Sequence, residues 1–99
     1  MIHITKQQEG DKLTVRMAGR LDTMSAPKLQ EELSGELDHV RELEFDIGEV
    51  EYISSSGLRV LLSCQKIMNR HGKMVIRNVQ EDVMEIFEVT GFTELFTIA

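Results

Sequence analysis

Three consecutive serines, Ser54, Ser55 and Ser56, stand where an apolar helix is predicted to begin, and Gly57 follows them. A serine hydroxyl is a good helix cap because it accepts a hydrogen bond from an unpaired backbone N–H group of the first turn. One serine is enough for that role, and a plain polar helix start is the simpler interpretation of the cluster. A helix N-terminus also carries partial positive charge and free N–H donors, which favour a phosphate group. The cluster therefore suggests a phosphorylation switch rather than a catalytic centre.

Other patterns that would support catalysis or metal binding are incomplete. Ser55 and Gly57 do not form a nucleophile elbow, because Ile53 stands where that motif needs glycine. Glu49 and Glu51 are paired carboxylates, and solvation is the simpler interpretation of both. The three histidines lack metal-ligand spacing and there is a single cysteine, so no zinc site is expected. We expect a protein that is not an enzyme and that uses no metal or cofactor.

The composition suits one domain over residues 1–99, with 41% hydrophobic and 28% charged residues. A formal net charge of -6 argues against nucleic acid or an anionic membrane surface as a partner. No apolar run is long enough for a membrane span, and the first four residues do not resemble a signal peptide. Cys64 is alone and cannot form an internal disulfide, and it falls on the apolar face of a predicted helix. These features predict a cytoplasmic protein.

Apolar residues along the chain change between a spacing of two, typical of strands, and a spacing of three or four, typical of helices. The predicted elements in order are strands at 2–4 and 13–17, a helix at 26–37, a strand at 43–47, a helix at 57–71, a strand at 74–76, a helix at 79–87 and a strand at 95–98. The first two strands are expected to form a hairpin with a turn at Gly10 and Asp11, and residues 48–53 are expected to form a loop. Ser25 and Asn78 are the expected N-caps of the first and third helices, and Gly72 and Gly91 are expected to end the second and third.

The order β-β-α-β-α-β-α-β predicts an α/β domain with a mixed central sheet of about five strands and three to four helices. The run 74–76 is apolar throughout, so we expect it to be buried on both faces. Loops that leave the C-terminal ends of parallel strands share one edge of a sheet, where ligands and partners usually bind. The loop at Asp22 and the serine cluster leave strands in that sense, so we expect them to be neighbours. The edge strand near residues 2–5 is compatible with either a monomer or a weak homodimer.

Residues 46–58 resemble the signature loop of STAS domains, in which an acidic residue ends a strand and Asp-Ser-Ser/Thr-Gly-Leu follows a short loop. Residues 19–22, Gly-Arg-Leu-Asp, resemble the Gly-x-Leu-Asp element of that family, and residues 72–74 and 90–92 fall at its later glycine turns. The resemblance covers essentially the whole chain and implies a STAS fold. The sequence departs from the family pattern at Ser54, which stands where the motif has aspartate.

Because no membrane segment is expected, the chain resembles the stand-alone STAS domains, which are mostly bacterial anti-sigma factor antagonists, rather than the cytoplasmic tails of transporters. The resemblance implies that the unmodified chain binds an anti-sigma factor with serine kinase activity and thereby releases a sigma factor for transcription. That kinase would phosphorylate Ser55, with Ser54 and Ser56 as alternatives, and a serine phosphatase would reverse the step. The missing motif carboxylate motivates an alternative: an unphosphorylated scaffold or sensor that binds a small anion, a nucleotide or a lipid. A small hydrolase is a third hypothesis, and the sequence lacks its nucleophile–base pair.

The candidate partner-binding residues lie in the two neighbouring loops and in the helix turn that follows: Asp22, Thr23, Met24, Ser54, Ser55, Ser56, Gly57 and Arg59. A turn or cap role for Asp22 is about as well supported as partner contact. Thr23 is interpreted more simply as a cap, and Arg59 as part of a solvated face. Arg59 would instead steer a partner or stabilise a phosphate if the serines are a switch site. Met24 would suit adaptable partner contacts at this surface.

Overall fold

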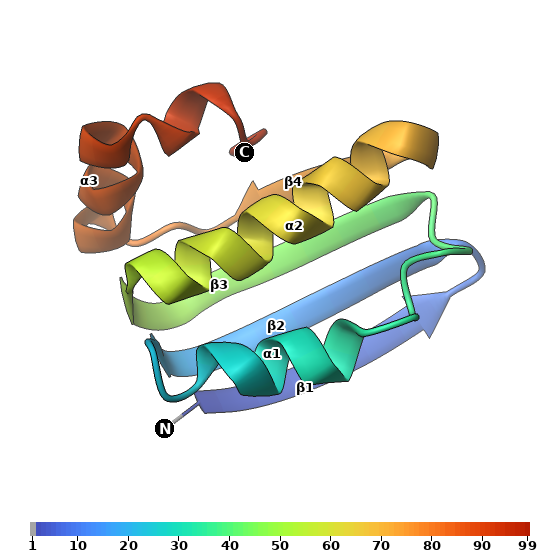
Figure 1. Cartoon of the computed structure of the whole chain (residues 1–99), viewed down its shortest axis with the longest axis horizontal. Coiled ribbons are helices and arrows are strands. Elements are labelled where there is room, and N and C mark those ends of the chain that lie inside the picture. Colours follow the sequence, from blue (N-terminus) through green and yellow to red (C-terminus); the bar gives the residue numbers. More distant parts are fainter. Residues whose placement is uncertain (1) are drawn as a thin grey trace.

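The computed structural model of the chain describes residues 2–99 and contains one mixed sheet (Figure 1). Its strands lie in the spatial order β1-β2-β3-β4, with the bounds β1 Ile2–Glu9, β2 Lys12–Leu21, β3 Glu42–Ile53 and β4 Lys73–Arg77. β1 and β2 form the expected antiparallel hairpin, and β3 runs parallel to both β2 and β4. This topology places the C-terminal ends of β2 and β3 at one edge of the sheet, as predicted.

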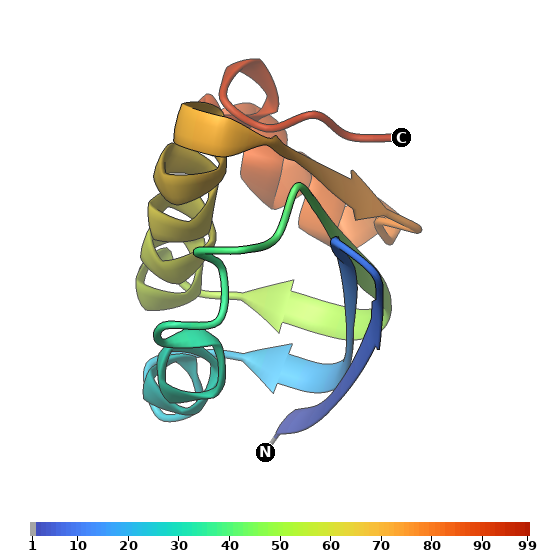
Figure 2. The same cartoon turned by 90° about the vertical axis from the view of Figure 1, so that its right-hand side faces the viewer.

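Helices α1 (Ala26–Leu33) and α2 (Ser55–His71) cover one face of this sheet (Figure 2). α2 lies between α1 and α3 (Glu81–Thr90), and the short 3₁₀ helix η1 (Phe92–Glu94) follows α3 (Figure 1). α1 is shorter than expected, since it ends at Leu33 rather than at Leu37. Leu37 still contributes a buried side chain, but it lies in the turn after the helix. Gly91 ends α3 as predicted, with the positive φ of 79° that glycine adopts without steric cost.

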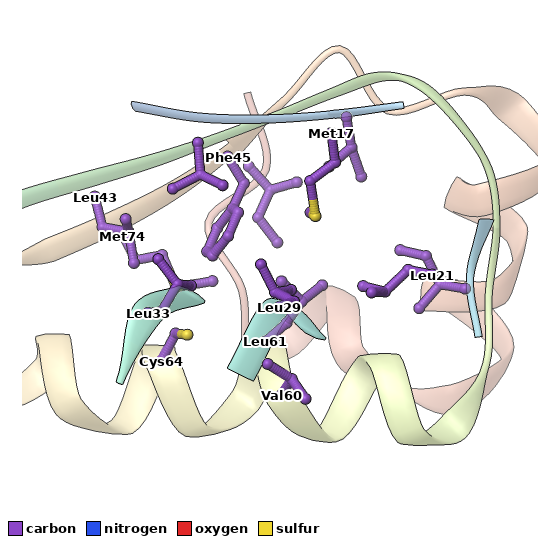
Figure 3. Packing of buried hydrophobic residues seen from close by; sticks show 14 of the residues in the cluster. Met17, Leu21, Leu29, Leu33, Leu43, Phe45, Val60, Leu61, Cys64 and Met74 are labelled. Atoms are coloured by element: carbon purple, nitrogen blue, oxygen red, sulfur yellow. The ribbon is translucent and has the colours of Figure 1, made fainter. Parts of the chain in front are cut away.

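The core lies between the sheet and these helices. Figure 3 shows side chains from α1, α2, β2, β3 and β4 that meet in one cluster: Leu29, Leu33, Val60, Leu61, Cys64, Met17, Leu21, Leu43, Phe45 and Met74. Burial raises the pKa of the Cys64 thiol to about 12, so this side chain stays protonated and apolar in the core, as expected. Gly72 ends α2 as predicted, and a Cβ atom there would collide with the carbonyl group of Arg41.

The sheet face away from the helices carries paired charges. β3 presents Glu42, Glu44 and Asp46 on this face, because Leu43 and Phe45 between them point into the core. Cations from β2 and β4 lie beside these acids in four ion pairs: Lys12–Glu44 at 3.6 Å, Arg16–Asp46 at 3.3 Å, Lys73–Glu42 at 3.6 Å and Arg77–Glu44 at 2.8 Å. Because this face is open, the middle residue of the run 74–76 is only half-buried, and the prediction that both faces of that strand are buried is wrong.

The expected loop at residues 48–53 is wrong, because β3 continues to Ile53. Two register shifts against β2 interrupt the alternation of buried and exposed side chains. The buried positions after Ile47 are Val50 and Ile53, which are three residues apart. A strand with that spacing does not show the period of two on which the sequence prediction relied.

The predicted final strand at residues 95–98 is also wrong, so residues 2–99 contain four strands rather than about five. Ile98 makes only an isolated parallel bridge to Ile76. The reason is an aromatic cluster in which Phe96 packs edge-to-face on Phe87, with centroids 5.7 Å apart, and on Phe92, at 5.4 Å. η1 brings Phe92 and Phe96 together in a way that an extended strand would not.

Asn78 does not cap α3, contrary to the prediction. The helix begins after Gln80, whose carbonyl oxygen accepts a hydrogen bond from the Met84 N–H group at 2.8 Å. Asn78 instead adopts a positive φ of 61°, and its amide donates to Asp46 Oδ1 at 3.1 Å. Asparagine tolerates this left-handed conformation better than most residues, which suits the turn between β4 and α3.

Candidate functional site

Ser54 is the N-cap of α2. Its hydroxyl oxygen accepts a hydrogen bond from the Gly57 N–H group at 3.2 Å, which satisfies one of the free donors of the first turn. Its own N–H group donates to the Leu21 carbonyl at 2.8 Å. This second bond joins the start of α2 to the end of β2, so the serine cluster and the loop at Asp22 are neighbours, as expected.

Ser55 and Ser56 differ in accessibility. Ser55 is the first residue of α2 and is exposed, and none of the side-chain hydrogen bonds within residues 2–99 uses its hydroxyl. Ser56 is half-buried and lines a shallow groove between α1 and α2. The Ser54 hydroxyl is occupied by its capping hydrogen bond. Ser55 is therefore the serine of the cluster that is exposed and whose hydroxyl, here called uncommitted, makes no side-chain hydrogen bond within the described chain.

Replacing Ser54 by alanine is expected to destabilise the domain by about 0.5–2 kcal/mol, because the Gly57 N–H group loses its acceptor. Ser54→Asp should retain wild-type stability or exceed it, since aspartate accepts the same bond and its charge suits the helix dipole. Urea denaturation of the three proteins measures both effects. If the alanine variant matches the wild type, the hydroxyl does not cap α2.

Gly57 lies where the first turn of α2 passes close to the end of β2. A Cβ atom at this position would lie 2.8 Å from both the Leu21 carbonyl oxygen and Leu21 Cγ, and 3.0 Å from Ile53 Cγ2. Only glycine therefore allows the first turn of α2 to sit this low over the ends of β2 and β3. The close approach determines how far the serine cluster projects from the edge of the sheet.

Asp22 organises the turn between β2 and α1. Its Oδ1 atom accepts hydrogen bonds from the Ser25 and Met24 N–H groups, both at 3.0 Å. These hydrogen bonds hold the pKa of the Asp22 carboxyl group below its ordinary value of 3.8, and the bond from the Ser25 N–H group has the largest effect. The turn role expected for Asp22 is thus present, and contact with a partner remains a prediction.

Ser25 is the N-cap residue of α1, as predicted, but its side chain makes no capping hydrogen bond to the helix. Its hydroxyl donates to the Arg20 carbonyl at 2.7 Å and accepts from the Asp22 N–H group at 2.9 Å. The hydroxyl therefore closes the turn back onto β2 instead of satisfying N–H groups of the helix. The signal for Asp22 as the local acceptor was its position three residues before Ser25, which is typical of turn-forming aspartate.

Asp22→Asn is expected to lower the melting temperature at neutral pH and to lose this effect in acid. The folded-state pKa of Asp22 is depressed, so its ionised form stabilises the native state. That contribution is fully present above the unfolded pKa and disappears as the pH falls through the lower folded value. Thermal melts of both proteins from about pH 6 to pH 2 follow the difference. A difference in melting temperature that does not change with pH would show that the charge of Asp22 is unimportant.

The remaining candidate residues surround this edge of the sheet. Met24 is 88% exposed, and Thr23 and Arg59 are also exposed. A groove of about 440 Å³ runs between α1 and α2 here and is lined by Thr23, Ala26, Pro27, Gln30, Ser56, Arg59, Val60 and Ser63. The structure thus gathers the predicted site residues on one surface, except that Gly57 is buried beneath it.

The sequence analysis missed one pair at this edge. The Arg20 guanidinium lies over the Tyr52 ring, 4.5 Å from its centroid, and Tyr52 is 37% exposed. These residues are partners in the parallel pairing of β2 and β3, which the expected loop at 48–53 concealed. The cation–π contact holds an arginine and an aromatic ring, two residue types enriched at protein interfaces, close to the serine cluster.

Other kinds of site are not evident in the described chain. Within residues 2–99, no group of three or more His, Cys, Asp or Glu side chains is arranged to hold a metal ion. Glu49 and Glu51 are both exposed, in agreement with the solvated interpretation. Among the helices of the same residues, none combines the length and apolar character needed to cross a membrane.

The mixed sheet, its two covering helices and the serine-capped α2 define a small α/β domain with its exposed polar chemistry at one sheet edge. The family described as Mlab, STAS domain, matches residues 4–97. The chain is 32% identical over 98 residues to BtrV of Bordetella bronchiseptica, a protein assigned as an anti-sigma factor antagonist, with 97% of this chain and 84% of BtrV covered. It is 30% identical over 95 residues to the anti-sigma-B factor antagonist of Bacillus subtilis, with 95% and 86% covered. The chain belongs to the STAS domain family.

Solved structures agree on the fold. An anti-sigma factor antagonist from Mycobacterium paratuberculosis superposes with a TM-score of 0.88 at 19% identity, covering 99% of this chain and 85% of that one. SpoIIAA superposes in its unphosphorylated form with a TM-score of 0.77 at 13% identity, covering 98% and 87%. Its phosphorylated form gives 0.76 at 15% identity, covering 98% and 91%. The STAS fold expected from the sequence is confirmed.

Proposed function

We propose that this chain is an anti-sigma factor antagonist that acts in the cytoplasm and is controlled by phosphorylation of Ser55. The unmodified chain binds an anti-sigma factor with serine kinase activity through the surface around Asp22, Met24 and the start of α2. Phosphorylation releases the chain from its partner, and a serine phosphatase restores it. The exposure of the uncommitted Ser55 hydroxyl at the N-terminus of α2 is the observation that carries this proposal.

Two further observations support it. The relatives in Bordetella bronchiseptica and Bacillus subtilis carry the name anti-sigma factor antagonist. The fold neighbour SpoIIAA has structures in both states, and this chain superposes on them about equally well, with TM-scores of 0.77 and 0.76. The fold of this chain therefore resembles that of SpoIIAA in both states.

The absence of the motif aspartate at position 54 is compatible with the switch. Serine and aspartate are both good N-caps, and Ser54 keeps the capping bond that aspartate would make. What is lost is the negative charge, since the first turn of α2 contains no acidic residue. A phosphate on Ser55 would add about 1.5 to 2 negative charges where the helix dipole favours them.

Phosphorylation mapped on the chain from its native cells tests the proposal. Trypsin should release residues 42–59 as one peptide, because Arg41 and Arg59 flank a stretch without lysine or arginine. We expect phosphate on Ser55 that varies with growth and stress conditions when phosphatases are blocked. Phosphate confined to Ser54 or Ser56 would move the switch, and an unmodified peptide under every condition would refute it.

The groove lined by Ser56 and Arg59 favours a second candidate function, an unphosphorylated sensor that binds a small anion, a nucleotide or a lipid. Thermal-shift measurements with ATP, GTP, inorganic phosphate and short-chain phospholipids distinguish the two candidates. A stabilisation that Arg59→Gln abolishes would favour the sensor. No stabilisation by any of these compounds would leave only the antagonist.

A further inference from the structure

The negative charge of the chain is concentrated at its C-terminal end. Residues 78–99 contain five acidic residues and no lysine, arginine or histidine. The remainder of the chain contains 12 of the 17 acidic residues and all 11 of the basic residues, so it is nearly neutral. α3 and η1 therefore account for most of the net charge of -6.

The acids of α3 oppose one another. Glu85 lies four residues after Glu81, three after Asp82 and three before Glu88, so it faces like charges on both sides along the helix. Glu81 and Asp82 suit the positive end of the helix dipole, but Glu88 lies toward the negative end. No ion pair within residues 2–99 involves these four side chains, whereas the acids of β3 are paired with cations. Helix stability alone does not explain Glu85 and Glu88.

Exposed apolar side chains accompany these acids. Val89 is 78% exposed and lies four residues after Glu85 and seven after Asp82, which places all three on the same side of α3. Leu95, directly after η1, is 51% exposed. Edge-to-face contacts among Phe87, Phe92 and Phe96 join α3 to η1. The packing of this aromatic cluster fixes the two helices that carry the exposed acidic and apolar side chains.

We propose that Asp82, Glu85, Glu88, Val89 and Leu95, here called the α3–η1 surface, bind a lysine- or arginine-rich segment of a partner protein that carries an apolar side chain between its cations. The cations of the segment neutralise carboxylates that have no partner in the described chain, and its apolar residue covers Val89. Charge complementarity at such a surface selects the partner and accelerates association, while apolar burial slows dissociation. Nucleic acid is excluded as the occupant because its phosphates would meet the same carboxylates.

The residues of this surface belong to other elements than the serine cluster, and the proposal makes no use of phosphorylation. α3 follows β4 and packs against β3, whereas the loop at Asp22 precedes α1 on the other side of α2 (Figure 1). The inference stands independently of the proposed function.

The test is an NMR titration of the ¹⁵N-labelled full chain with a synthetic peptide. In this peptide, pairs of lysines alternate with leucine. A peptide with glutamate in place of lysine and a peptide with serine in place of leucine are the probe controls. We expect shift changes centred on residues 82–95 and binding that weakens as salt is raised, since exposed charges are screened. Both control peptides should bind at least about tenfold more weakly.

Two charge-matched variants make the test specific. Glu85→Lys/Glu88→Lys should weaken peptide binding at least about tenfold. It should melt no lower than wild type, because position 85 then carries a charge opposite to those of Glu81 and Asp82. Glu9→Lys/Asp38→Lys makes the same change in net charge at exposed residues outside the surface, and should alter binding by less than about twofold. Val89→Ser should weaken binding of the leucine peptide but not of the serine peptide.

Several outcomes would overturn the proposal. One is an equal loss of binding in the two double variants, which would indicate only a response to net charge. Others are shift changes centred on Asp22 or the serine cluster, or no binding at about 1 mM peptide. Self-association of the chain that Glu85→Lys/Glu88→Lys abolishes would assign the surface to a second copy instead of a cationic partner.

Discussion

Gly57→Ala is expected to destabilise the domain by about 1–3 kcal/mol, even though alanine is the better helix former. An alanine methyl group would lie 2.8 Å from the Leu21 carbonyl oxygen, a backbone atom of a central strand that has little freedom to move. α2 must then shift outward, which weakens the bond from Ser54 to Leu21 and the packing of Leu61 beneath the helix. Urea denaturation monitored by far-UV circular dichroism measures the loss.

The sign of this effect distinguishes the two physical causes. In an open helix, glycine to alanine stabilises by roughly 1 kcal/mol through lower chain entropy in the unfolded state. Ser63→Ala, an exposed position two turns further along α2, is the control and should change stability by less than about 0.5 kcal/mol. A Gly57→Ala variant more stable than wild type would mean that α2 does not approach β2 as closely as described.

The sequence predicted most of the scaffold because several signals agreed in each element. The hairpin β1–β2 combines alternation with a turn at Gly10, and α2 combines an apolar face with a serine start and Gly72 at its end. Parallel pairing of β2 and β3 then followed from the order of elements, and so did the juxtaposition of Asp22 with the serine cluster. Apolar spacing and turn residues were sufficient to predict an element wherever the spacing continued without interruption.

The rest depended on contacts between distant residues. The register shifts of β3 arise from its pairing with β2, so Tyr52 and its contact with Arg20 were hidden within an apparent loop. Residues 95–98 do not form a strand because Phe96 packs on Phe87 of α3 and on Phe92. The choice of Ser54 as cap required the position of Leu21, because the Ser54 N–H group must reach that carbonyl as its hydroxyl turns toward Gly57. Arg20 and Leu21 lie too far in sequence from Tyr52 and Ser54 for a local pattern to reveal their contacts, and the contacts among Phe87, Phe92 and Phe96 do not follow the spacing of one regular helix or strand.

Phosphorylation of Ser55 is expected to weaken binding to the anti-sigma factor by a few hundred-fold, which corresponds to about 3–4 kcal/mol. In the free chain the phosphate is solvated and lies at the positive end of α2, so the fold tolerates it. In the complex the same charge would have to be desolvated or would meet acidic groups of the partner, and no comparable compensation is available. The effect is therefore a difference between bound and free states rather than a change in the fold.

Calorimetry with the anti-sigma factor and four forms of the chain separates the contributions. The unmodified chain and Ser55→Ala should bind equally, Ser55→Asp more weakly, and chain phosphorylated on Ser55 most weakly, since aspartate carries less charge than phosphate. NMR shifts caused by phosphorylation should stay near the first turn of α2 and Arg59, which is one helical turn after Ser55. If phosphorylated chain binds as tightly as unmodified chain, Ser55 is not the switch. If it binds weakly but shows shifts across β1 and α3, the charge acts by altering the fold, and the fixed-scaffold mechanism proposed for this switch is wrong.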